Sequence, residues 1–269
     1  MRRCLMDFAR TLFIALAWAL GASLHANAGW FSFGDRWKEE ARLHDGRTII
    51  VERYQNYGRN NLIGQPPPFH EQTLRFSLPN VDRVFEWAAP YDEFNGQSDL
   101  IILAVHVLKN TPYIITAPNL CIDYNKWNRP NPPYVVFEWK EGAWQRIPWG
   151  DVPTEFHDIN LTTGERVQLG ERPAGTNTIP ADVIARWNTE ASLPQFKKIL
   201  REPLNPAPGC IPMITNGKGL WLTRERFSRM KDLEACQREC YIKKFEKETC
   251  PCREIFEGRR EDPPRVTAP

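Results

Sequence analysis

Residues 134–147 read YVVFEWKEGAWQRI and give the clearest indication of the fold. Two runs rich in aromatic and β-branched residues flank Glu141-Gly142, a combination that is typical of a β-hairpin. A turn at this dipeptide places two pairs of residues directly opposite each other: Trp139 with Trp144 on one face, and Val136 with Ile147 on the other. Aromatic cross-strand pairs stabilise a sheet by roughly 0.2–1 kcal/mol each. The stretch therefore predicts an antiparallel hairpin.

Further strand-like runs precede this hairpin. Apart from His106, Leu100–Leu108 is apolar on both faces, so we predict a central strand, and Tyr113–Thr116 is predicted to be its neighbour. Thr73–Leu78 alternates polar and apolar residues, as a half-buried strand does. Asp45-Gly46 separates two more runs and predicts a hairpin turn in which both residues have a positive φ. We expect a mostly β protein with an antiparallel, sandwich-like or irregular β domain over residues 29–175.

The sequence changes character beyond this β-rich part. A helix is expected to start after Thr178, because a proline and an aspartate follow in its first turn. Asn216-Gly217 predicts a hairpin turn, and residues 228–248 are rich in Lys, Glu and Arg and predict a helix. We expect a small α-containing region stapled by disulfides over residues 176–252, followed by a flexible tail over residues 253–269.

Six cysteines follow Cys4 and are expected to form three disulfide bonds. They are Cys121, Cys210, Cys236, Cys240, Cys250 and Cys252. An even number of cysteines in an exported chain indicates a disulfide framework.

The order of pairing follows from geometry. Cys236 and Cys240 lie one turn apart on one face of the predicted C-terminal helix. Cys250 and Cys252 follow a helix stop and, in an extended segment, point the same way. A chain that returns along the helix favours the bonds Cys240–Cys250 and Cys236–Cys252. The crossed pairing is the alternative. Cys121 and Cys210 are then left to pair with each other.

A four-cysteine zinc site is the competing interpretation of the last four cysteines. Their spacing is C-x3-C-x9-C-x-C, and C-x-C is tighter than the usual gap of two to four residues. An oxidising compartment favours disulfides, so neither a metal site nor a cofactor is predicted.

Residues 1–28 have the three parts of a secretory signal peptide. A basic start at Met1-Arg2-Arg3 is followed by an apolar core over residues 12–20 and by Ala26-Asn27-Ala28. The core has about half of the roughly 20 apolar residues that a membrane span needs. We expect cleavage before Gly29, a periplasmic or secreted location, and no transmembrane span in the mature chain.

The mature chain is expected to be close to neutral. The full sequence has 35 Lys and Arg against 33 Asp and Glu, and the first 28 residues hold Arg2, Arg3, Arg10 and Asp7. A nucleic-acid footprint needs a concentrated basic face. Nucleic acid is therefore not an expected partner.

The sequence contains no complete catalytic motif. The G-x-S-x-G nucleophile motif is absent, and His106, inside an apolar strand, is predicted to be a core histidine. An envelope hydrolase remains the alternative function, with Asp123, His157 and Asp158 as acid–base residues that converge only in three dimensions. Asn160-Leu161-Thr162 is a glycosylation sequon if the protein is eukaryotic.

The Pro-rich stretch NKWNRPNPP, residues 125–133, is a loop by composition. With the residue that follows it, this loop supplies the predicted binding surface: Trp127, Asn128, Arg129 and Tyr134. The ten tryptophans are mainly expected in packing, because large aromatics are most often buried. A stacking surface for sugar or peptide is the alternative. The main expectation is a non-enzymatic binding or structural module whose exposed Trp- and Pro-rich loops contact an envelope protein or polymer.

Several stretches resemble a family of exported proteobacterial proteins to which no activity is assigned. They are Arg42–Arg47, Asn119–Val135, Cys210–Met213 and the closing pattern from Cys236 to Cys252. The likeness covers most of the mature chain. It implies a periplasmic setting and adds nothing about mechanism.

Overall fold

The computed structural model describes residues 34–57, 69–79, 81–92, 97–168, 170–171 and 177–257. The predicted signal peptide (residues 1–28) and residues 258–269 of the predicted tail lie outside these ranges. The larger strands are β1 (Gly34–Arg42), β2 (Thr48–Tyr57), β3 (Phe69–Ser77), β4 (Val84–Ala88), β7 (Leu100–Leu108), β8 (Thr111–Pro118), β9 (Val135–Lys140) and β10 (Ala143–Ile147). The short strands are β5 (Tyr91–Asp92), β6 (Gln97–Ser98), β11 (Thr178–Ile179), β12 (Met213–Thr215) and β13 (Trp221–Thr223).

The helices are short. They are α2 (Cys121–Lys126), η2 (Trp149–Asp151), α3 (Glu165–Gln168), α4 (Ala181–Thr189), η3 (Pro194–Phe196), α5 (Arg224–Ser228), α6 (Leu233–Ile242) and α7 (Cys252–Glu257). Within the described ranges, no helix combines the length and the apolar character needed to cross a membrane.

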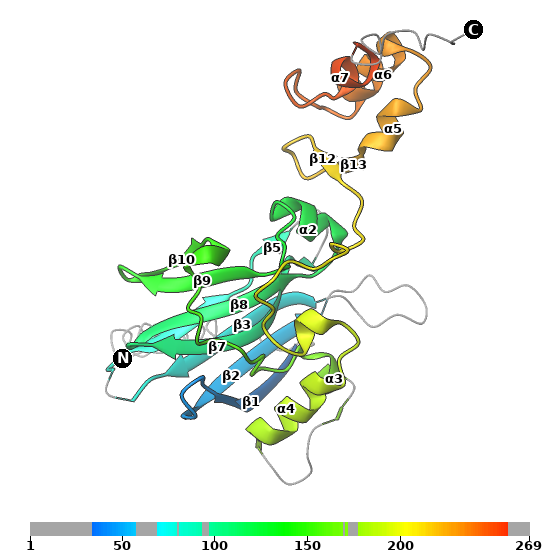
Figure 1. Ribbon diagram of the computed structural model, residues 1–269. Helices are drawn as coiled ribbons and strands as arrows, with labels where there is room; N and C mark the ends of the chain where they lie inside the picture. Colours follow the sequence, from blue (N-terminus) through cyan, green and yellow to red (C-terminus); the bar gives the residue numbers. More distant parts are fainter. Residues whose placement is uncertain are drawn as a thin grey trace, which may run out of the picture. The chain divides into compact units, whose positions relative to one another are not determined.

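Two sheets form the main body of the protein (Figure 1). The first has the strand order β11-β1-β2-β3-β4 and the second has the order β10-β9-β8-β7. Their pairings are antiparallel, except that β11 runs parallel to β1. The predicted mostly β, antiparallel class is confirmed. The first sheet extends past the expected boundary at residue 175, since β11 belongs to it and the N–H of Ala181 in α4 donates to the Glu40 carboxylate (3.1 Å).

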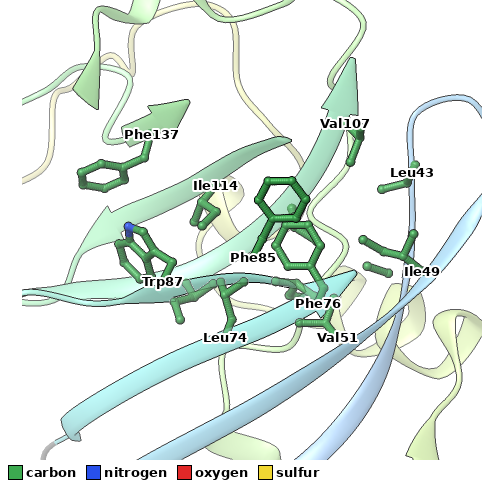
Figure 2. Close-up of a cluster of buried hydrophobic side chains, with 14 of the residues drawn as sticks. Leu43, Ile49, Val51, Leu74, Phe76, Phe85, Trp87, Val107, Ile114 and Phe137 are labelled. Carbon is green, nitrogen blue, oxygen red and sulfur yellow. The ribbon is translucent and has the colours of Figure 1, made fainter. Parts of the chain in front are cut away.

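The inner faces of the two sheets share one apolar core (Figure 2). Phe76 of β3 and Phe85 of β4 stack with ring centroids 5.4 Å apart. Trp87 of β4 meets Phe137 of β9 across the interface at 5.3 Å. Because side chains of both sheets interdigitate here, the arrangement is the predicted sandwich.

β7 is an edge strand, which corrects the prediction that it is central. One face lies on the shared core, and the other lies on a second cluster that contains Phe156 and Ile199. A β-bulge between Ile102 and Ala104 shifts the alternation along the strand. The strand is apolar on both faces because a later segment of the chain covers the face that the first sheet does not.

Asn160 closes the free edge of β7. Its Oδ1 accepts the N–H of Val105 (3.0 Å), and its Nδ2 donates to the carbonyl of Val105 (2.7 Å) and to that of Arg42 (2.9 Å). The N–H of Leu161 donates to the carbonyl of Leu103 (3.1 Å). One amide side chain thus takes the place of a neighbouring strand, which protects the edge from pairing with another chain.

The hairpin predicted at Glu141-Gly142 is confirmed. Trp139 pairs with Trp144, and Val136 pairs with Ile147. Glu141 and Gly142 have φ angles of 54° and 85°, as a two-residue hairpin turn with two left-handed positions requires.

The turn between β1 and β2 is wider than predicted. The N–H of Leu43 donates to the carbonyl of Arg47 (2.7 Å), so five residues form the loop. Only Gly46 has a positive φ, of 85°. Asp45 acts through its side chain instead, accepting the N–H of Arg47 (3.1 Å). This is the usual way in which aspartate stabilises a turn.

A buried ion pair fastens residues 162–164 to the first sheet. Arg53 Nη1 donates to Glu39 Oε1 (2.6 Å) and to the carbonyl of Thr162 (3.2 Å), and the N–H of Thr162 donates to Glu39 Oε2 (2.9 Å). Gly164 follows with a φ of +88°, and a Cβ there would lie 2.4 Å from Gln55 Oε1. The position therefore requires glycine.

Residues 213–257, which we call the cystine module, have a core of their own. It contains Phe227, Phe245, Ile255, Cys236, Cys240 and Cys252. α6 is shorter than the predicted helix over residues 228–248. It begins after Asp232, whose side chain accepts the N–H of Ala235 (2.8 Å), and the chain turns away at Lys244, with a φ of 57°.

All three predicted disulfide bonds are confirmed. They are Cys121–Cys210, Cys236–Cys252 and Cys240–Cys250. The local conformation differs from the prediction in one respect, because Cys252 opens helix α7 rather than lying in an extended segment. The first five residues of the predicted flexible tail belong to that helix.

Candidate binding surface

The outer face of the first sheet carries a row of alternating charges. Successive residues of a strand point to opposite faces, and this alternation brings one charged residue from each of four strands into register. The row runs from β1 to β4 as Lys38, Glu52, Arg75 and Glu86. The next row along the strands contains Arg36, Tyr54 and Thr73.

The first half of the charged row is neutralised internally. Lys38 Nζ lies 2.8 Å from Glu52 Oε1. The hydrogen bond and the positive charge of Lys38 lower the pKa of Glu52, with a smaller contribution from Arg75. Both partners are about half exposed, so the pair contributes little to stability.

The second half of the row is not neutralised in the same way. Arg75 and Glu86 are direct cross-strand neighbours, but neither makes an ion pair with another residue that the structure describes. Both side chains are exposed. A guanidinium and a carboxylate thus remain side by side, each able to bind a group of opposite charge.

These rows line a hollow of about 630 Å³ that is open to solvent. Thr73, the smallest side chain of the two rows, lies between larger residues, and Asn177 borders the hollow beside β11. The guanidinium of Arg36 lies over the ring of Tyr54, 4.6 Å from its centroid. The lining residues that are not buried thus include three cationic and two anionic side chains around the ring of Tyr54, while Trp37 and Arg53 border the hollow from buried positions.

The lining defines what the hollow can bind. Arginine binds carboxylates through parallel N–H donors, a carboxylate accepts hydrogen bonds from hydroxyl or ammonium groups, and a tyrosine face can stack on a flat apolar surface. A ligand with carboxylates and hydroxyls fits this set.

The predicted binding loop, residues 125–133, does not line the hollow. Trp127 packs against the shared core, and Arg146 lies over its ring at 5.2 Å. Tyr134 is only 4% exposed, and its hydroxyl lies 3.0 Å from the carbonyls of both Gln195 and Lys198. Burial raises the pKa of Tyr134 to about 12. Of the four predicted residues, only Asn128 is exposed.

The same loop holds the chain on either side of Cys210. Arg129 Nη2 donates to the carbonyl of Cys210 (2.8 Å), and Asn131 bonds both backbone groups of Leu204 (2.7 and 3.0 Å). Asn128 and Arg129 have φ angles of 65° and 52°, a reversal that lets the N–H of Arg129 donate to the carbonyl of Tyr124 (2.7 Å). Most polar groups of the loop are thus engaged within the chain.

The three residues of the hydrolase alternative lie in unlike surroundings. Asp123 is fully buried, and its Oδ2 accepts the N–H of Leu120 at the start of α2 (3.1 Å). His157 and Asp158 are exposed, in the segment that follows η2. The carbonyl of Asp158 lies 2.9 Å from Nε2 of His106. None of the three lines the hollow.

His106 has the core position that the sequence predicts. It is fully buried and stacks on Phe156 with centroids 4.7 Å apart. Burial lowers the pKa of His106 to about 4, so the imidazole is neutral near pH 7. His44 contacts the same Phe156 ring at 5.3 Å and is only partly exposed.

Sequence reasoning missed the outer face of the first sheet. The outward-facing charged residues of β1–β4 lie at alternate positions of their strands, which by itself indicates only a solvated face. The row is recognised only when the strand register is known, because it joins residues up to 48 positions apart, from Lys38 to Glu86.

The chain matches no protein-family model, no curated protein and no solved structure.

Proposed function

We propose that this protein is an exported, non-enzymatic binding module of the cell envelope. Its ligand is a carboxylate-bearing partner or polymer that lies in the hollow on the outer face of the first sheet. The observation that carries the proposal is the adjacent, exposed pair Arg75 and Glu86, which form no ion pair with other described residues. Elsewhere in the row, Lys38 and Glu52 neutralise each other.

Three disulfide bonds support the exported location. They bridge separations of 89, 16 and 10 residues. Such bonds persist in secreted and periplasmic proteins and are rare in a reducing cytosol. The signal-peptide pattern of residues 1–28 agrees with this location.

The binding mode follows from the positions of the side chains. A ligand carboxylate accepts hydrogen bonds from Arg75, while Glu86 accepts hydrogen bonds from hydroxyl or amino groups next to it on the ligand. Tyr54 in the neighbouring row, with Arg36 over its ring, borders the ligand. Because Arg75 and Glu86 are exposed, we expect modest affinity that weakens as salt is added.

Titration with polymers tests this proposal. The probes are polygalacturonate and poly-glutamate, with dextran as the uncharged comparison, and binding is measured by calorimetry at low and high salt. We expect both anionic probes to bind and dextran not to bind. Replacing Arg75 by Gln should weaken binding at least tenfold.

The matched control is Arg186→Gln, which removes an exposed arginine from α4, outside the hollow. It should leave the affinity unchanged. Equal affinities of the Arg75→Gln and Arg186→Gln proteins would refute the proposed surface, because binding would then follow overall charge. Thr73→Trp, which fills the hollow, provides an independent check and should also abolish binding.

A further inference from the structure

We infer that the four cysteines of the cystine module form a zinc site when they are reduced, so that disulfide bonding and metal binding exclude each other. The residues are Cys236, Cys240, Cys250 and Cys252. This inference is independent of the outer-face hollow.

The sulfur atoms are already close to the arrangement that zinc requires. The Sγ atoms of Cys240, Cys250 and Cys252 all lie within 4.8 Å of one another, and those of Cys240 and Cys252, which belong to different disulfides, are 3.5 Å apart. In a tetrahedral site with Zn–S bonds of about 2.3 Å, neighbouring sulfurs are about 3.8 Å apart. Three sulfurs therefore lie within reach of one metal ion once the Cys240–Cys250 bond opens.

Cys236 supplies the fourth corner. It lies one turn before Cys240 on the same face of α6 and is bonded to Cys252. Opening the two disulfides requires the bonded sulfurs to separate to about 3.8 Å. The Cα atoms of the two pairs are 5.7 and 5.9 Å apart, so changes of side-chain rotamer are sufficient for this movement.

The backbone holds the ligands in place without help from the disulfides. Cys240 lies in helix α6, and its carbonyl accepts the N–H of Phe245 (2.9 Å). The N–H of Cys250 donates to the carbonyl of Glu246 (3.0 Å). Cys236 and Cys252 are fully buried, which excludes water from the metal, as in structural zinc sites with four protein ligands.

A metal would also substitute for the covalent links. Three of the six residues in the core of the module are cysteines, and a unit of this size needs a cross-link or a metal to remain folded. Zinc binding can supply that free energy in small cysteine-rich domains. A reduced chain would thus keep the module folded by binding zinc.

The reaction balances with a dithiol as the reductant. Two dithiol molecules give four electrons and four protons to the two S–S bonds, forming four thiols and two molecules of oxidised dithiol. Zn²⁺ then displaces four protons as four Zn–S bonds form. In the reverse direction, two molecules of the oxidised dithiol accept four electrons from the four thiolates and take up four protons, which restores both disulfides of the protein and releases the metal.

Cobalt titration of the full chain tests the inference. Cys4, Cys121 and Cys210 are replaced by serine to leave only the four cysteines of the module, and the protein is titrated before and after reduction. We expect the reduced protein to bind one Co²⁺ per chain with the absorption bands of a tetrahedral thiolate site, and Zn²⁺ to displace it. The oxidised protein should bind none.

The Cys236→Ser variant in the same background tests the ligand set. It should lower the affinity at least tenfold and change the spectrum. Absence of tetrahedral bands in the reduced protein, or unchanged affinity in this variant, would overturn the inference. If the serine background does not fold, native mass spectrometry of the reduced unsubstituted chain decides: one bound zinc with four protons lost supports the site, and any other result overturns it.

Discussion

The sandwich and the cystine module are stabilised in different ways. The sandwich buries side chains from seven strands in one core, and burial alone can stabilise a body of that size. The core of the module has six buried residues, three of them cysteines, and two disulfides cross it. The comparison indicates that apolar packing holds the first region and covalent links hold the second.

The largest effect is expected from a cavity in the sandwich. Leu74 is fully buried between the sheets, and Leu74→Ala should lower the free energy of unfolding by about 3–5 kcal/mol. Urea titration followed by near-ultraviolet circular dichroism measures the change. Ile50→Ala, at a position 45% exposed on the next strand, is the control and should cost far less. Similar losses for the two variants would contradict the role given to the shared core.

The corresponding experiment on the cystine module removes one of its disulfides. Replacing Cys236 and Cys252 together by serine should destabilise the module by about 3 kcal/mol, because the bond closes a loop of 16 residues. Limited proteolysis with mass spectrometry should find new cuts within residues 213–257 and a resistant sandwich. Early cleavage of the sandwich would show that the two regions are not independent in stability.

Acid should affect the sandwich before the module. The pKa of His106 is about 4 in the folded protein because of burial, against about 6.5 in the unfolded chain. Between these pH values the unfolded state binds a proton that the folded state does not, so stability falls as the pH drops from 6.5 to 4, by about 3 kcal/mol in total.

Unfolding measured across this pH range tests the effect. His106→Leu should flatten the dependence, whereas His157→Gln, at an exposed position, should leave it unchanged. A dependence that survives in His106→Leu would assign it to other groups.

The smallest effect concerns one helix of the module. Asp232 caps α6 through its bond to the N–H of Ala235, and Asp232→Ala should cost about 1 kcal/mol. Hydrogen exchange of the α6 amides measures this loss. Glu234→Ala removes a neighbouring exposed acid and is the matched control. Equal acceleration of exchange in both variants would mean that Asp232 acts by charge alone.

The predictable parts of the fold depend on local patterns. Glu141-Gly142 specifies its own hairpin, and the cysteine spacing in the module restricts the pairings. The place of β7 depends on Phe156 and Asn160, which lie about 50 residues later. A sequence that is apolar on both faces indicates burial on both sides, but not whether a strand or a loop provides the cover.

The proposed binding surface was less predictable for the same reason. Tyr134 follows a Pro-rich loop, yet its hydroxyl meets carbonyls 61 and 64 residues away, and it is buried. Arg75 and Glu86 are neighbours only through the pairing of β3 with β4. Each outcome is set by long-range register, which local composition does not contain.

The closure of β7 by Asn160 has a consequence for how the protein is produced. Asn160-Leu161-Thr162 would be a sugar-acceptor site in a eukaryotic secretory host, but both hydrogens of the amide are used in the folded state, by the carbonyls of Val105 and Arg42. An oligosaccharide could be attached only before the sandwich assembles, and the edge could not then close. In such a host, glycosylation at this position would mark the molecules that failed to fold.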